Sequence, residues 1–171
     1  KDADGWIHTG DVGAWLPSGH LSIIDRRSNV FKLSQGEYIA VEKVERAVCR
    51  CPLVATCFVF GTSLNSKLVA VCVANPEALD PALKAANIDK AKDAAAVRKF
   101  VTDRVAAACR DAGLLGYEIP GALSLKDPPG GFTVDTGVLT PTFKIVRGVA
   151  KQFFAEDIKQ LYAEIGEDVK L

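Results

Sequence analysis

The stretch LVATCFVFGTSLNSKLVAVCVAN, residues 53–75, consists of two apolar runs joined by the polar segment TSLNS. Each run is as long as one strand and is rich in β-branched and aromatic residues, which favour strands. Continuous apolar runs are typical of strands that are buried on both faces. The stretch therefore predicts two buried antiparallel strands at the centre of the fold.

Three helices are expected around these strands. In VEKVERAVCRC, which begins at Val41 and is ended by Pro52, the apolar residues recur at helical spacing. Residues 93–112 predict one long helix with a single apolar stripe. The last helix is expected to run from about Arg147 to Ala163.

The remaining segments complete an α+β domain. GALSLK, residues 121–126, predicts a third short strand, and residues 127–143 are rich in Pro, Gly and Thr and indicate a loop. Residues 5–26 predict a β-hairpin that reverses at PSGH, and VFKLSQGEYIA continues with strand-like residues on both sides of Gly36. The predicted fold is a small domain with a short antiparallel sheet flanked by helices, preceded by a β-hairpin.

Composition excludes several classes of function. The 171 residues carry 21 basic and 21 acidic residues, so no net charge draws the chain to nucleic acid or to an anionic membrane. The five cysteines form no CxxC pair and only two histidines accompany them, which argues against a zinc site and predicts no metal site. Reduced thiols of a cytosolic type of protein are expected. Because the chain starts at Lys1 without a methionine, we expect it to be part of a longer polypeptide.

Polar residues interrupt the apolar pattern in three places. At the hairpin, Asp11 could be an ordinary turn residue or form a salt bridge with Arg26, or the two could bind ribose hydroxyls and a phosphate. Gly36 weakens a strand, which indicates either a β-bulge or the close approach of a narrow ligand. Lys144, in LTPTFK, is either a surface lysine or a residue on a mobile loop that meets negative charge on phosphate or carboxylate.

These motifs resemble a known family in their order and spacing. GWIHTGDVGAWLPSGHLSIIDRRSNVFKLSQGEYIAVEKVE is similar to the C-terminal region of adenylate-forming acyl-CoA synthetases, and KLSQGEYIA with LTPTFK resembles the long-chain fatty acyl-CoA branch. The resemblance implies a ligase that uses ATP and Mg²⁺ to convert a fatty acid into an acyl-adenylate, which coenzyme A then converts into a thioester. It also implies that residues 1–27 end the large AMP-binding domain and that residues 28–171 form a mobile domain, which rotates between the two steps.

The same resemblance assigns roles to single residues. Asp11, in the motif Thr9-Gly10-Asp11, would bind the ribose hydroxyls of ATP or AMP together with Arg26, and Thr9 would belong to the same site. Lys144 would act in adenylate formation, whereas Lys32 would act in thioester formation. The coenzyme A site would include Gly36, Glu37 and Tyr38. The hinge would lie at Ser28, where relatives commonly have Asp or Lys, and Asn29 replaces the usual acid.

Two alternatives remain open at this point. The chain could serve an adenylate-forming enzyme for another carboxylate, or could be a non-catalytic interaction domain descended from one. The phosphate loop, adenine pocket and acyl tunnel of the family are not in these residues, so we expect the chain alone to be inactive. We expect the protein in the cytosol or on the cytosolic face of a membrane, with any peripheral membrane association depending on other segments.

Overall fold

The computed structural model describes all residues from 1 to 171, and a three-stranded sheet lies at its centre. The strands follow the order β5-β6-β7, with bounds Val54–Phe60 (β5), Val69–Ala74 (β6) and Ala122–Lys126 (β7). β5 and β6 are antiparallel, which confirms the prediction from residues 53–75. The third strand is also present, but it is parallel to β6, so the sheet is mixed and not purely antiparallel as expected.

Parallel pairing requires a long crossover connection. The chain between β6 and β7 accordingly passes through two helices, α2 (Pro76–Ala85) and α3 (Ala94–Asp111). The long helix expected over residues 93–112 is confirmed as α3, and the Asp93 side chain caps it by accepting a hydrogen bond from the backbone N–H of Ala96. The sequence pattern did not predict α2.

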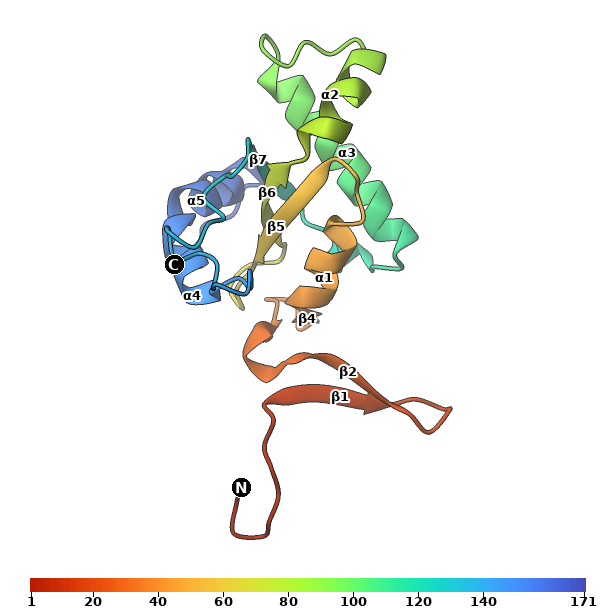
Figure 1. The fold of residues 1–171 in the computed structure, drawn as a ribbon, viewed down its shortest axis with the longest axis vertical. Helices are drawn as coiled ribbons and strands as arrows, with labels where there is room; N and C mark the ends of the chain where they lie inside the picture. Colours follow the sequence, from red (N-terminus) through yellow and green to blue (C-terminus); the bar gives the residue numbers. More distant parts are fainter.

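Helices cover both faces of the sheet (Figure 1). One face packs against α2, α3 and α1 (Val41–Val48), and the other packs against α4 (Arg147–Phe153) and α5 (Ala155–Glu164). Because strand side chains alternate between faces, Cys57 and Val59 of β5 enter the first core, whereas Phe58 and Phe60 enter the second. Two apolar cores, separated by the sheet, therefore hold the domain together.

Two helix boundaries differ from the expectation. The first helix ends at Val48, so Cys49 and Cys51 follow the helix and do not lie on it. Cys51 is buried, while Cys49 is exposed with its Sγ 3.7 Å from the Sγ of Cys57. The final helix is divided at Phe154, whose backbone angles (φ −96°, ψ 18°) separate α4 from α5.

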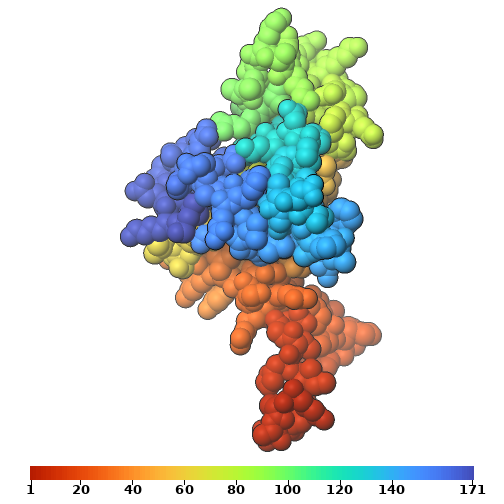
Figure 2. Space-filling view, turned by 60° about the vertical axis from the view of Figure 1, so that its left-hand side comes forward, coloured from red at the N-terminus to blue at the C-terminus, as the bar shows by residue number.

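Two hairpins precede the domain core. The first, β1 (Asp11–Trp15) with β2 (Leu21–Arg26), forms a narrow projection below the body (Figures 1 and 2), and the expected strand before Asp11 is absent. The second joins β3 (Val30–Lys32) to β4 (Tyr38–Ala40). Gly36 lies in its turn with φ +100°, which only glycine adopts easily, so it marks a turn and not a bulge inside a strand. No helix is both long enough and apolar enough to cross a membrane.

Candidate functional site

Asp11 and Arg26 lie opposite each other where the two strands of the first hairpin meet the rest of the chain. The backbone N–H of Asp11 donates to Thr9 Oγ1 at 3.2 Å, and the backbone N–H of Arg27 donates to the Gly10 carbonyl at 2.8 Å. Both side chains of the pair are exposed, and no ion pair joins them. The salt-bridge alternative is therefore wrong, and both charges face solvent.

A cavity of about 640 Å³ brings Arg26 close to the segment that carries Lys144. Its lining comes from the end of β2, the following turn, α1 and the segment before α4, and consists of Arg26, Ser28, Asn29, Glu42, Glu45, Phe143, Lys144, Ile145 and Arg147. Neither Arg26 nor Lys144 forms an ion pair within the chain. The Glu42 carboxylate lines the same cavity and also forms no ion pair. A guanidinium and an ammonium that have no ion-pair partner can stabilise a phosphate or a developing oxyanion.

Lys144 lies in a hydrogen-bonded turn that follows the loop expected over residues 127–143. Leu139 and Ile145 form a β-bridge across this turn. Within it, the Thr140 N–H donates to the Lys144 carbonyl at 2.8 Å, and the Lys144 N–H donates to Thr140 Oγ1 at 3.0 Å. Phe143 adopts a positive φ of 59° at the tip. Both backbone groups of Lys144 are therefore hydrogen-bonded within the turn, and its side chain is exposed.

The residues expected at coenzyme A form a second, separate group. Lys32 pairs with Tyr38 across the second hairpin, and its Nζ lies 5.6 Å from the centre of the Tyr38 ring. Gly36 follows in the same turn, where an added Cβ would stand 3.6 Å from Lys32 Cε. The Glu37 carboxylate lies near Tyr117, and burial together with this carboxylate raises the pKa of Tyr117. None of these residues lines the cavity of Lys144.

A buried carboxylate beside the expected hinge was not identified from the sequence. Asp25 is 3% exposed, and its Oδ2 accepts the backbone N–H of Glu42 in the first turn of α1 at 2.9 Å. The Asn29 side-chain amide donates to Asp25 Oδ1 at 3.2 Å and to Glu42 Oε1 at 2.8 Å. Asn29 thus bridges two carboxylates, a role that the usual acid at this position could not fill because a carboxylate has no donor.

Asn29→Asp is expected to lower the free energy of unfolding of the chain by about 3 kcal/mol, the lower end for the loss of two hydrogen bonds to charged groups. It also places a third negative charge beside Asp25 and Glu42. Urea unfolding would measure the loss, with Asn29→Ser as the control that removes the bonds without adding charge. We expect the aspartate variant to be the less stable of the two, with a difference that shrinks at high salt. Equal stability of all three proteins would contradict the bridging role.

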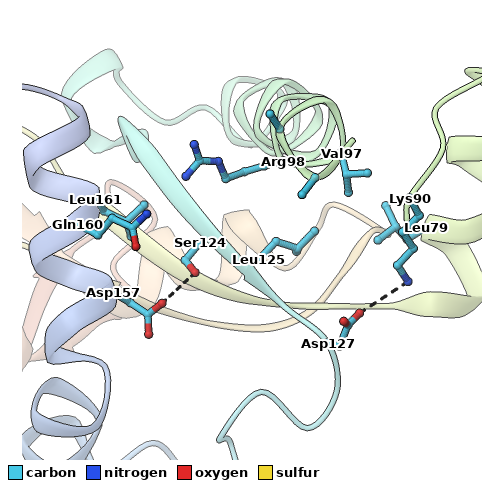
Figure 3. A pocket seen from close by; sticks show the side chains of 12 residues that line it. Leu79, Lys90, Val97, Arg98, Ser124, Leu125, Asp127, Asp157, Gln160 and Leu161 are labelled. Carbon is cyan, nitrogen blue, oxygen red and sulfur yellow. Dashed lines mark hydrogen bonds and ion pairs between the residues drawn. The ribbon is translucent and has the colours of Figure 1, made fainter. Parts of the chain in front are cut away.

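A different cavity, of about 430 Å³, lies between α3, β7 and α5 (Figure 3). None of the expected site residues lines it. Its charged groups are already paired: Lys90 with Asp80 and Asp127, Arg98 with Glu164, and Asp157 with Lys126. Ser124 also donates to Asp157. Its polar groups therefore satisfy one another, whereas Arg26 and Lys144 form no ion pair.

Nowhere in the chain do three or more His, Cys, Asp or Glu residues form a group that could hold a metal ion.

Comparison with known proteins places this geometry in context. No family model matches the chain. It is 47% identical over 169 residues to long chain acyl-CoA synthetase 7, peroxisomal, of Arabidopsis thaliana, covering 96% of this chain and 24% of the relative. It is 40% identical over 171 residues to long-chain-fatty-acid–CoA ligase 5 of Rattus norvegicus, covering 97% of this chain and 25% of the relative. The chain thus spans about a quarter of the length of these curated relatives.

A solved structure supports the same relationship. The adenylation and carrier-protein didomain of carboxylic acid reductase from Segniliparus rugosus, solved in complex with AMP, is 37% identical to the chain. It superposes with a TM-score of 0.81 over 96% of this chain and 22% of that chain. The chain is thus homologous to long-chain acyl-CoA synthetases over nearly its whole length, and its mixed α+β architecture matches the C-terminal domain of adenylate-forming enzymes.

Proposed function

We propose that the chain is the mobile C-terminal part of an enzyme that activates a long-chain fatty acid with ATP and transfers the acyl group to coenzyme A. The observation that carries this proposal is the meeting of Arg26 and Lys144 at one cavity. Neither cation forms an ion pair within the chain, so both side chains could bind the charged groups of an acyl-adenylate.

In the first half-reaction, a fatty acid carboxylate attacks the α-phosphorus of ATP, and pyrophosphate leaves. Negative charge then grows on the oxygens around phosphorus, and the Lys144 ammonium would stabilise that charge. The Asp11 carboxylate, which can only accept hydrogen bonds, suits the ribose hydroxyls, and Arg26 would act beside it. Mg²⁺ would reduce the charge of the triphosphate, and its ligands would come from the nucleotide and from residues outside this chain.

In the second half-reaction, the thiol of coenzyme A attacks the acyl carbonyl, and AMP leaves. Lys32, Glu37 and Tyr38 would act here, with Gly36 leaving space for the narrow thiol-bearing arm. Because this group and Lys144 occupy different places on the domain, one orientation cannot present both, and a rotation at Ser28 would exchange them. Residues 1–27 would stay with the large domain, and the exposed apolar side chains of Trp15, Leu21 and Ile23 support such packing.

Two further points belong to the proposal. The chain alone would be inactive, because the pockets for adenine and for the acyl chain would lie in the large domain. The enzyme would work in the cytosol or at the cytosolic face of a membrane. The match to a carboxylic acid reductase adenylation domain is the observation behind one alternative, in which the chain serves an adenylate-forming enzyme for another carboxylate.

Pyrophosphate release by the full-length protein tests the proposal. The protein would be supplied with ATP, Mg²⁺ and fatty acids of increasing chain length, beside an aromatic acid as the competing carboxylate. We expect release that depends on a long-chain acid, and an acyl thioester when coenzyme A is added. Release with the aromatic acid alone would replace the fatty acid with another substrate. Absence of release with every acid would favour the non-catalytic interaction domain. Activity of the isolated chain would contradict the prediction that catalysis needs the large domain.

A further inference from the structure

The ion pair between Glu45 and Arg147 lies in the wall of the cavity that Lys144 faces. It is bidentate: Arg147 Nη1 donates to Glu45 Oε1 at 3.0 Å, and Nη2 donates to Oε2 at 2.7 Å. The side chain of Arg147 is only 24% exposed and that of Glu45 only 12%, so water screens the pair weakly. Two parallel hydrogen bonds fix the direction of the guanidinium as well as its distance.

This pair attaches the Lys144 segment to the rest of the domain. Arg147 begins α4, three positions after Lys144. Glu45 lies within α1, and its Oε1 also accepts the backbone N–H of Val59 in β5 at 3.0 Å. The Val146 N–H donates to the Val138 carbonyl at 2.9 Å. The Lys144 turn is therefore held at its own base and, through one carboxylate, to both α1 and the central sheet.

The energetics of the pair favour a role in positioning over a role in stability. Removing two charges from water is costly, and burial raises the pKa of Glu45 above its usual value, although Arg147 acts in the opposite direction. Replacing such pairs with apolar residues often leaves a protein equally stable or more stable. What an apolar pair could not supply is the fixed fork geometry.

We propose that Glu45 and Arg147 are positioning residues for adenylate formation. They hold the segment of Lys144 so that its ammonium faces the same cavity as Arg26. Through α1, the same network reaches Asp25, next to Arg26, because Asp25 accepts the N–H of Glu42. Glu45, Arg147 and Lys144 all lie after Ser28 and move together in the proposed rotation. The inference rests on the proposed function and assigns it two residues for which the sequence suggested no role.

The test uses Glu45→Gln and Arg147→Lys in the full-length protein. Glutamine keeps an oxygen for Val59 but loses the charge, and lysine keeps the charge but loses the fork. We expect kcat for pyrophosphate release to fall about tenfold to a hundredfold, as for a misplaced catalytic group, with KM for ATP little changed. Thioester formation from supplied acyl-adenylate and coenzyme A should stay within about twofold, since Lys144 is not used in that step.

Asp157→Asn is the matched control, because Asp157 belongs to a partly buried ion pair with Lys126 at the distant cavity. It should leave both half-reactions unchanged. Hydrogen exchange in the isolated chain gives a second readout: Glu45→Gln should speed exchange at the amides of Thr140 and Val146, and the control should not.

The outcomes separate the two proposals. A wild-type enzyme without adenylation activity would overturn the proposed function and this inference with it. An active wild type whose Glu45 and Arg147 variants lose both half-reactions equally, or lose neither, would overturn the positioning role alone.

Discussion

Lys144→Ala in the full-length protein is expected to slow acyl-adenylate formation by about a hundredfold to a thousandfold, the usual loss when one preorganised charge-stabilising group is removed. The Lys144 ammonium has no ion pair and stands on a closed turn at the cavity of Arg26, so its charge could stabilise the phosphate in the proposed reaction. Alanine removes that charge without disturbing the turn, because Thr140 binds the backbone of Lys144 and not its side chain. Thioester formation from supplied acyl-adenylate should be nearly unaffected.

Lys32→Ala is expected to show the reverse pattern, with thioester formation reduced by about tenfold or more and adenylate formation largely retained. Lys32 lies with Tyr38 and Gly36 on the second hairpin, away from the Lys144 cavity. Pyrophosphate release measures the first step, and conversion of synthetic acyl-adenylate to acyl-CoA measures the second. Lys84→Ala, at an exposed lysine of α2, is the control that should alter neither step. Equal losses in both steps for both variants would refute the assignment of the lysines to separate half-reactions.

Phe154→Ala is expected to reduce the free energy of unfolding by about 3–5 kcal/mol, the range for removal of a buried phenylalanine. Phe154 is 1% exposed at the junction of α4 and α5. Its ring centre lies 5.0 Å from that of Phe132 and 6.2 Å from that of Phe58, so it joins the loop, the sheet and the last helices. A smaller residue would leave a cavity that the rigid sheet cannot close.

Urea unfolding of the chain, followed by circular dichroism, would measure this loss. Phe153→Ala is the matched control, since Phe153 is the adjacent residue and its side chain is 50% exposed. We expect the control to lose less than about 2 kcal/mol. If Phe153→Ala proved as damaging as Phe154→Ala, the second core would not depend on the residue that the structure places at its centre.

The elements that the sequence predicted well are those whose pattern is local. β5 and β6 are continuous apolar runs, and α3 has one apolar stripe and an N-terminal Asp93 cap. The break at Phe154 could not be found in this way, because the buried residues Ala150, Phe154 and Ile158 keep helical spacing across it. α2 contains Pro76 and Pro81, which interrupt a helical reading, although a proline at the first helical position is itself a start signal.

The same distinction between local motifs and distant contacts applies to the site. The roles expected of Asp11, Arg26, Lys32 and Lys144 came from motifs, and the structure adds that Arg26 and Lys144 share one cavity while Lys32 lies elsewhere. The partners that hold these residues come from distant parts of the chain. Glu45 and Arg147 are 102 positions apart, and no local spacing signals their pairing. Packing brings them together, so only the folded chain reveals them.

The contact between Asp25 and the start of α1 has a consequence for the population of each domain orientation. Two hydrogen bonds to this carboxylate, from the Glu42 N–H and the Asn29 amide, join groups on opposite sides of Ser28. A rotation at Ser28 would break both, and a hydrogen bond to a charged group is worth about 1.5–3 kcal/mol. Even one such bond would bias the equilibrium between orientations by about tenfold or more. The ligand of the second step would then need a differential affinity of at least that size, and Asp25 and Asn29 would decide which of the two proposed orientations is populated without that ligand.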